Sequence, residues 1–183
     1  MQTAHIKVPA ELFALAESSR FEGELDLETF TATGDAYAPV GPIAWWVDIT
    51  NTGEALLVSG KARCTAQTDC ARCLKPAEFD FEGDIEGYFL IDEDAAGPDD
   101  MAADEFDVLP ASHVIDLEPL IVAGLIMDAP TVPLCSDDCA GLCNVCGADL
   151  NEGPCGCDTT AEDEAFEEAK NPFAVLKNLS FDD

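Results

Sequence analysis

The sequence contains few basic residues. Eight lysines and arginines stand against 38 aspartates and glutamates in 183 residues, and the formal net charge is −30. Affinity for nucleic acid comes largely from lysine and arginine side chains that displace counterions from phosphates. A chain this acidic is repelled by phosphate backbones and by anionic membrane surfaces. The charge therefore favours a cationic partner, such as a basic protein.

Long apolar runs and targeting signals are also missing. The first residues, MQTAHIKVPAELFALAESSR, lack the basic segment and apolar stretch of a secretory signal. No apolar run approaches the roughly 20 residues that a membrane helix needs. We therefore expect a cytoplasmic protein that binds neither membrane nor DNA. In that compartment clustered cysteines bind metal more often than they form disulfides.

The motifs of catalysis are absent as well. The two histidines, His5 and His113, lie far in sequence from any serine or cysteine constellation, and no zinc-protease, dinucleotide or phosphate-loop motif occurs. The carboxylates of EFDFEGDIE alternate with apolar residues, which is typical of the solvated face of a strand. We expect that the protein is not an enzyme.

The first three-fifths of the chain show the alternating pattern of β-strands. Strands are predicted at residues 21–29, 43–49, from 56 onwards and at 78–91, where apolar and polar residues alternate. Trp45 and Trp46 should lie on opposite faces, one in the core and one partly exposed. Gly83 and Gly87 predict a bulge or bend in the last strand. Together these features predict a curved antiparallel sheet.

The chain after residue 91 contains two predicted helices, separated by acidic and cysteine-rich segments. The segment DLEPLIVAGLIMDAP predicts a helix, with Asp116 as N-cap and Pro119 in the first turn. NPFAVLKNL predicts a short helix capped by Asn171. The expected fold is α+β: a curved antiparallel sheet with a packed helix and a C-terminal zinc-knuckle segment. The expected domains are a β-rich core at 1–130 with an acidic loop at 92–107, a cysteine-rich segment at 131–158, and an acidic tail at 159–183.

Six of the nine cysteines lie within residues 135–157. Cys143-Asn-Val-Cys146-Gly147 has the form of a zinc knuckle, in which two thiolates face one ion and the glycine lets the backbone turn. Zinc takes four such ligands in a tetrahedron. Two other pairs could complete the site: Cys135 with Cys139 upstream, or Cys155 with Cys157 downstream. A zinc ion with four thiolates has no open position, so its role would be structural.

A further pair, Cys70 and Cys73, follows one strand and precedes another. One hypothesis joins this pair to Cys135 and Cys139, which leaves the last four cysteines for a second zinc. The alternatives are one zinc with spare thiols, a purely structural pair, or a redox dithiol at Cys70 and Cys73. Cys64 falls on the inner face of its strand, and we expect it in the core.

Half of the basic residues are crowded into 15 positions of this acidic chain. Such a strip could contact RNA or a protein partner directly, and it favours an RNA-binding module as the rival function. The residues are Lys61, Arg63, Arg72 and Lys75.

The motifs together resemble the bacterial YceD family, the large ribosomal RNA subunit accumulation proteins. The resemblance rests on CARCL at Cys70–Leu74, on GLCNVCGADLNEGPCGC at Gly141–Cys157, and on NPFAVL at Asn171–Leu176. It implies a role in making or stabilising large-subunit ribosomal RNA, and it implies no catalytic residues. Combined with the charge, it predicts a large-subunit ribosomal protein or pre-ribosomal particle as the partner, with ribosomal RNA affected indirectly.

Overall fold

The computed structural model describes residues 3–92, 101–102 and 105–157. In chain order the elements are β1 (His5–Lys7), the 3-10 helix η1 (Ala10–Phe13), β2 (Ser18–Leu25), β3 (Phe30–Ala32), β4 (Asp35–Pro39), β5 (Ile43–Asn51), β6 (Ala55–Asp69), β7 (Pro76–Leu90), β8 (Asp107–Val108), β9 (Val114–Asp116) and α1 (Glu118–Asp128). The described residues fall into two compact units, one made of those within 1–70 and 75–135 and the other of those within 71–74 and 136–157. No described helix has the length and apolarity that a membrane crossing requires.

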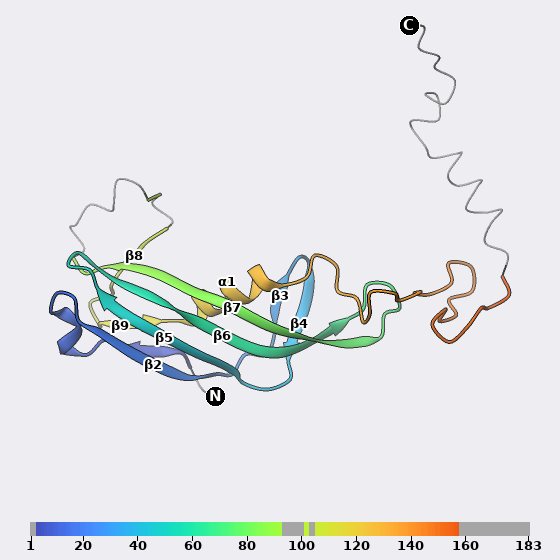
Figure 1. Cartoon of the computed structure of the whole chain (residues 1–183), viewed down its shortest axis with the longest axis horizontal. Coiled ribbons are helices and arrows are strands. Elements are labelled where there is room, and N and C mark those ends of the chain that lie inside the picture. The colour runs from blue at the N-terminus through green and yellow to red at the C-terminus, as the bar shows by residue number, and fades with distance from the viewer. Residues whose placement is uncertain (1–2, 93–100, 103–104, 158–183) are drawn as a thin grey trace, which may run out of the picture. The chain divides into compact units, whose positions relative to one another are not determined.

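A seven-stranded sheet organises the first unit, and β6 is its central strand (Figure 1). Along one side β6 pairs antiparallel with β5 and, near its end, with β4. Along the other side it pairs with β7 in an unbroken register from Ala55↔Leu90 to Asp69↔Pro76. The outer strand β2 pairs antiparallel with β5, and the short β8 adds to β7 in parallel. The predicted antiparallel sheet with one packed helix is confirmed.

The alternating sequence pattern gives this sheet one apolar and one polar face. In β5 every second residue from Ile43 to Asn51 is buried. Trp45 lies on the buried face with 8% of its surface exposed, whereas Trp46 lies on the opposite face. The expected division of the two tryptophans is therefore confirmed.

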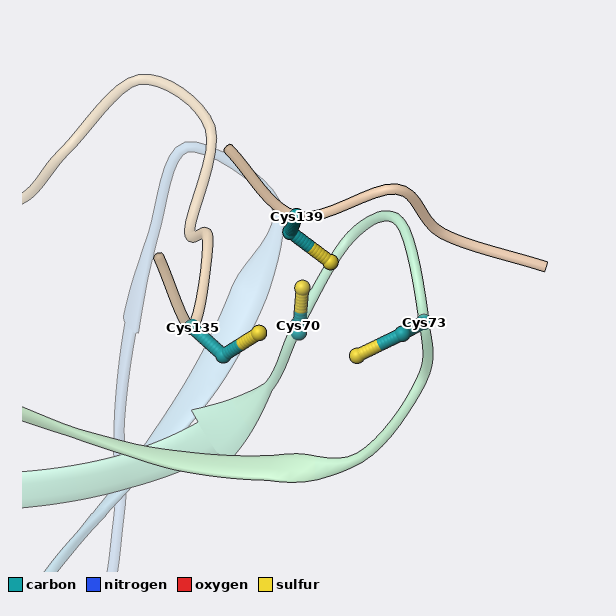
Figure 2. Close-up of side chains that lie close together, drawn as sticks. All are labelled: Cys70, Cys73, Cys135 and Cys139. Carbon is teal, nitrogen blue, oxygen red and sulfur yellow. The ribbon is translucent and has the colours of Figure 1, made fainter. Parts of the chain in front are cut away.

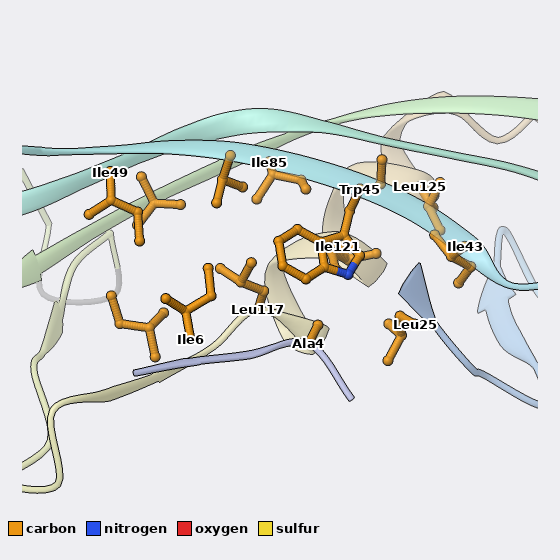
Figure 3. Packing of buried hydrophobic residues seen from close by; sticks show 14 of the residues in the cluster. Ala4, Ile6, Leu25, Ile43, Trp45, Ile49, Ile85, Leu117, Ile121 and Leu125 are labelled. Carbon is orange, nitrogen blue, oxygen red and sulfur yellow. The ribbon is translucent and has the colours of Figure 1, made fainter. Parts of the chain in front are cut away.

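The apolar face of the sheet packs against α1 and the small β1–β9 sheet (Figure 3). Ile6 of β1, Ile115 of β9 and Ile121 of α1 belong to the same buried cluster as Trp45 and Ile85. Burial of these side chains is the main source of stability, at roughly 25 cal/mol for each Å² of apolar surface removed from water.

Two glycines let α1 approach β7 closely. A side chain at Gly124 would place its Cβ 2.2 Å from the carbonyl oxygen of Asp84, and one at Gly83 would meet the backbone of Gly124 at 2.4 Å. Of the bulge or bend predicted at Gly83 and Gly87, the bulge is wrong, because the register through both residues is continuous. Gly83 instead provides the space in which the helix sits.

Other sequence boundaries also need correction. The first long strand covers Ser18–Leu25 rather than 21–29. The N-cap of α1 is Leu117, although the Asp116 carboxylate accepts a bond from the Glu118 N–H at 3.0 Å. Asp107 of the expected acidic loop belongs to β8. Residues 93–100, 103–104 and the expected tail helix at 171–179 lie outside the described residues.

Candidate metal centres

The first candidate centre contains Cys70, Cys73, Cys135 and Cys139 (Figure 2). Their four sulfur atoms lie within 4.8 Å of one another and point toward a common centre. Zn–S bonds of about 2.3 Å in a tetrahedron require sulfur atoms about 3.8 Å apart. The donor set and its spacing therefore fit a zinc ion after a small contraction.

The turn between β6 and β7 presents two of these thiols. The Cys70 N–H donates to the Lys75 carbonyl at 2.9 Å, which closes the end of the hairpin. Leu74 has a φ of 58°, so the chain reverses directly after Cys73. Cys70 and Cys73 are both buried although they lie in a turn, which is the environment of a closed structural site.

The second candidate centre contains Cys143, Cys146, Cys155 and Cys157, whose sulfur atoms also lie within 4.8 Å of one another. The knuckle around the first two is a tight turn. The Cys143 N–H donates to the Ala148 carbonyl at 2.8 Å, and the Gly147 N–H donates to the Cys143 carbonyl at 2.9 Å. Gly147 has a φ of 73°, a conformation that glycine adopts without strain.

The thiols of this second centre differ in acidity. The backbone N–H groups of Cys146 and Val145, together with the Cys155 side chain, lower the pKa of Cys143 to about 7. Hydrogen bonds with Cys146 and Cys155 raise the pKa of Cys157 to about 12. The backbone N–H groups around Cys143 therefore favour its thiolate, the form that binds a metal ion. A divalent ion would compensate that charge and displace the remaining thiol protons.

Two residues that are not cysteines, Arg72 and Asn151, form hydrogen bonds with the loop around Cys139. The Arg72 guanidinium donates to the Cys139 carbonyl at 2.9 Å. Asn151 donates from Nδ2 to the Cys139 sulfur at 3.5 Å and accepts from the Ala140 N–H at 2.8 Å. Sequence analysis missed Asn151, although it lies within the GLCNVCGADLNEGPCGC block that carries the resemblance.

The eight cysteines therefore divide as the two-site hypothesis places them. Cys143 and Cys146 are grouped with the downstream pair, and Cys70 and Cys73 with the upstream pair. None of the nine cysteines, all in described residues, forms a disulfide. Cys64 is in neither group: it is half-buried against the core, and burial, with a smaller effect of Asp80, raises its pKa to about 11.

The basic residues singled out as contacts are engaged with the protein itself. Lys61 pairs with Glu82 at 2.8 Å and with Asp84 at 3.0 Å, and Arg63 pairs with Glu82 at 2.7 Å. Arg72 holds the Cys139 carbonyl, and Lys75 also has a partner. A contact of these four residues with RNA or a protein stays a prediction.

Neither histidine is a member of the two cysteine groups found among the described residues. His5 Nε2 is 3.8 Å from the Asp116 carboxylate, and the His113 ring packs on Phe13 with centroids 4.9 Å apart. Both side chains are exposed and serve the contacts around β1 and β9.

Comparison with known proteins gives one family and several relatives. The family model described as "Large ribosomal RNA subunit accumulation protein YceD" matches residues 58–180. Uncharacterized proteins of Mycobacterium bovis and Mycobacterium tuberculosis are 26% identical over 147 residues, which is 80% of this chain and 67% of theirs. An uncharacterized protein of Mycobacterium leprae is 28% identical over 60% of this chain and 49% of its own. No solved structure matches the chain.

Proposed function

Because the chain belongs to the YceD family of large ribosomal RNA subunit accumulation proteins, we propose that it is a ribosome biogenesis factor for the large subunit. It acts by binding a basic large-subunit ribosomal protein, or an assembly intermediate that contains one. The main support for this mechanism is the net charge of −30, which disfavours direct binding to RNA phosphates.

The solvent face of the sheet supports a cationic partner. Strand register places its charged residues together on one side of β2, β5, β6 and β7. The acidic residues of this face are Glu22, Glu24, Asp48, Glu78, Asp80, Glu82, Asp84 and Glu86, and the basic ones are Arg20, Lys61 and Arg63. The excess of carboxylates complements a basic surface and steers its approach.

One arginine of the chain itself, Arg20, is already bound on this face. The Arg20 guanidinium lies 4.3 Å from the centre of the Trp46 ring and donates to the Asp48 carboxylate at 2.9 and 2.5 Å. An aromatic ring beside a carboxylate is a favourable environment for guanidinium groups. Arginines of a partner would meet the same chemistry at neighbouring positions.

In this mechanism the acidic chain shields the positive charge of a free ribosomal protein. During assembly, ribosomal RNA takes the place of the acidic chain. Large-subunit RNA is then lost indirectly when the protein is missing, because incomplete particles are degraded. This proposed activity needs no catalytic residue. That the protein is not an enzyme and that it works in the cytoplasm both stay predictions.

We also propose that the chain binds zinc in a structural role. Each group of four thiolates would hold one ion, with Cys70, Cys73, Cys135 and Cys139 at one centre and the last four cysteines at the other. Four-thiolate zinc leaves no open position for substrate or water. The ion would contribute folding energy to loops that have few apolar residues of their own.

Direct binding of precursor RNA is the second candidate. It would use the strip from Lys61 to Lys75. We rank it lower because Lys61 and Arg63 already pair with the carboxylates of Glu82 and Asp84. Those carboxylates would repel a phosphate that approached the same lysine or arginine.

Depletion of the protein in its own cell tests the function. The expected result is a selective fall in large-subunit ribosomal RNA relative to small-subunit RNA, restored by the wild-type chain. An unchanged ratio would refute the role in ribosome assembly. A restored ratio with a variant in which Lys61 and Arg63 are both glutamine would argue against the RNA-binding alternative.

A further inference from the structure

The outer strand β2 has a free edge. It pairs with β5 on one side, and no other strand pairs with it in the described part of the chain. The Asn51 N–H donates to the Glu17 carbonyl at 2.9 Å. This bond shows which residues of β2 form the hydrogen-bonded pairs with β5, because such pairs alternate along an antiparallel ladder. Given the register, the odd residues from Ser19 to Leu25 then bond to β5. The N–H and C=O groups of Ser18, Arg20, Glu22 and Glu24 point away from the sheet.

A groove of about 590 Å³ runs along this free edge. Ile6 of β1, Phe21 of β2 and the Trp45 indole supply its apolar lining. The Trp45 ring fills the place of a side chain at Gly23, where a Cβ would lie only 2.7 Å from the ring. The groove therefore offers apolar surface beside a row of unpaired backbone groups.

Carboxylates occupy the other side of the same edge. Glu22 and Glu24 lie on the solvent face of β2, and neither forms an ion pair within the described residues. A strand added to β2 would place alternate side chains above this face and the others toward the groove. The complementary segment is thus extended, with basic residues alternating with apolar ones.

We propose that β2 binds an extended basic segment of a partner protein by adding it as a further strand of the sheet. Backbone hydrogen bonds to the four even residues provide affinity, and Glu22 and Glu24 select lysine or arginine. An edge of this length otherwise promotes non-specific pairing, so a dedicated occupant also explains why it is left open. The inference rests on the proposed function for the class of partner, and it adds the place and mode of binding.

Hydrogen exchange with a synthetic peptide tests the mode. The probe is a short peptide in which arginine and valine alternate, added to the full-length, zinc-loaded chain. Binding should protect the backbone amides of Arg20, Glu22 and Glu24. The matched control is the same peptide with alternate backbone nitrogens methylated, which keeps the charge and cannot pair. Equal binding of both peptides, or no protection of these amides, would overturn strand addition.

Two substitutions at one position separate backbone pairing from charge. Glu22→Pro removes an N–H that points away from β5, so the sheet keeps its own ladder. It should weaken peptide binding about tenfold, the value of one or two backbone hydrogen bonds. Glu22→Gln should weaken it about threefold or less. Unchanged unfolding midpoints show that both variants fold, and equal affinity of Glu22→Pro and wild type would overturn the proposal.

The same variants separate this inference from the proposed function. If Glu22→Pro still binds basic ribosomal proteins as wild type does, the edge is not their docking site while the function stands. If the peptide adds to β2 but no basic ribosomal protein binds the chain, the proposed function fails instead. Concentration-dependent protection of the β2 amides without peptide would show that a second copy of the chain occupies the edge, which contradicts the assigned occupant.

Discussion

At the scale of single residues, Asn51 is the one polar side chain that is buried among the described residues. It donates to the Leu12 carbonyl at 2.8 Å and accepts from the Gly53 N–H at 2.7 Å, so it joins η1 to the turn after β5. Asn51→Ala leaves both backbone groups without their partner, which costs about 1–3 kcal/mol. Urea unfolding should show this loss, whereas Ser18→Ala, which removes an exposed hydroxyl bond to Thr50, should change stability by less than about 0.5 kcal/mol. Equal effects would refute the special role of Asn51.

Cys64 gives a second prediction at this scale. Its pKa of about 11 means that the thiol stays protonated at neutral and mildly alkaline pH, because a raised pKa delays ionisation. Only the thiolate reacts quickly with alkylating reagents. In the zinc-loaded chain at pH 8, iodoacetamide should therefore label Cys64 far more slowly than it does after unfolding, as measured by mass spectrometry of the peptides. Labelling at the rate of the unfolded chain would contradict the burial of this thiol.

At the scale of elements, the contact between α1 and β7 depends on the absence of a side chain at residue 124. Gly124→Ala would push a methyl group against the Asp84 carbonyl and lift the helix from the sheet. Overpacking of this kind costs about 1–3 kcal/mol, which exceeds the gain in helix propensity. Ala123→Ser on the exposed side of the same helix serves as control. A Gly124→Ala variant as stable as wild type would show that α1 does not pack this closely.

The long elements were predictable from sequence because their periodicity reports burial directly. β6 and β7 alternate over most of their 15 residues, and α1 has a proline in its first turn and another shortly after its end. The three-residue strands β1 and β9 are too short for a period, and they pair across more than 100 residues. Gly83 predicted a bulge or bend, and not a helix contact, because a sequence does not show which helix approaches a strand.

The cysteine groups could be predicted only as alternatives. Spacing identified Cys143 and Cys146 as one half of a site, and it allowed either neighbouring pair as the other half. The division into two groups depends on the hairpin turn at Cys70 and Cys73, which lies more than 60 residues earlier. Such long-range proximity is a property of the fold, not of local spacing.

At the scale of the whole molecule, the two candidate metal centres lead us to expect two zinc ions per chain. Elemental analysis of the purified protein should find this stoichiometry. Cys70→Ser and Cys155→Ser should each lower it by about one ion, because each removes one of four thiolates. Cys64→Ser is the matched control, and it should leave both ions in place. A single ion in the wild-type chain would restrict the metal to one of the two groups.

The partner that we propose for this acidic chain is a basic large-subunit ribosomal protein. The most direct test is capture of the tagged, zinc-loaded protein from its own cell at physiological salt, with and without ribonuclease, followed by identification of bound proteins and RNA. We expect a basic large-subunit ribosomal protein to be enriched and to remain bound after ribonuclease treatment. Recovery of large-subunit RNA without any basic ribosomal protein, or loss of all partners after ribonuclease, would contradict it.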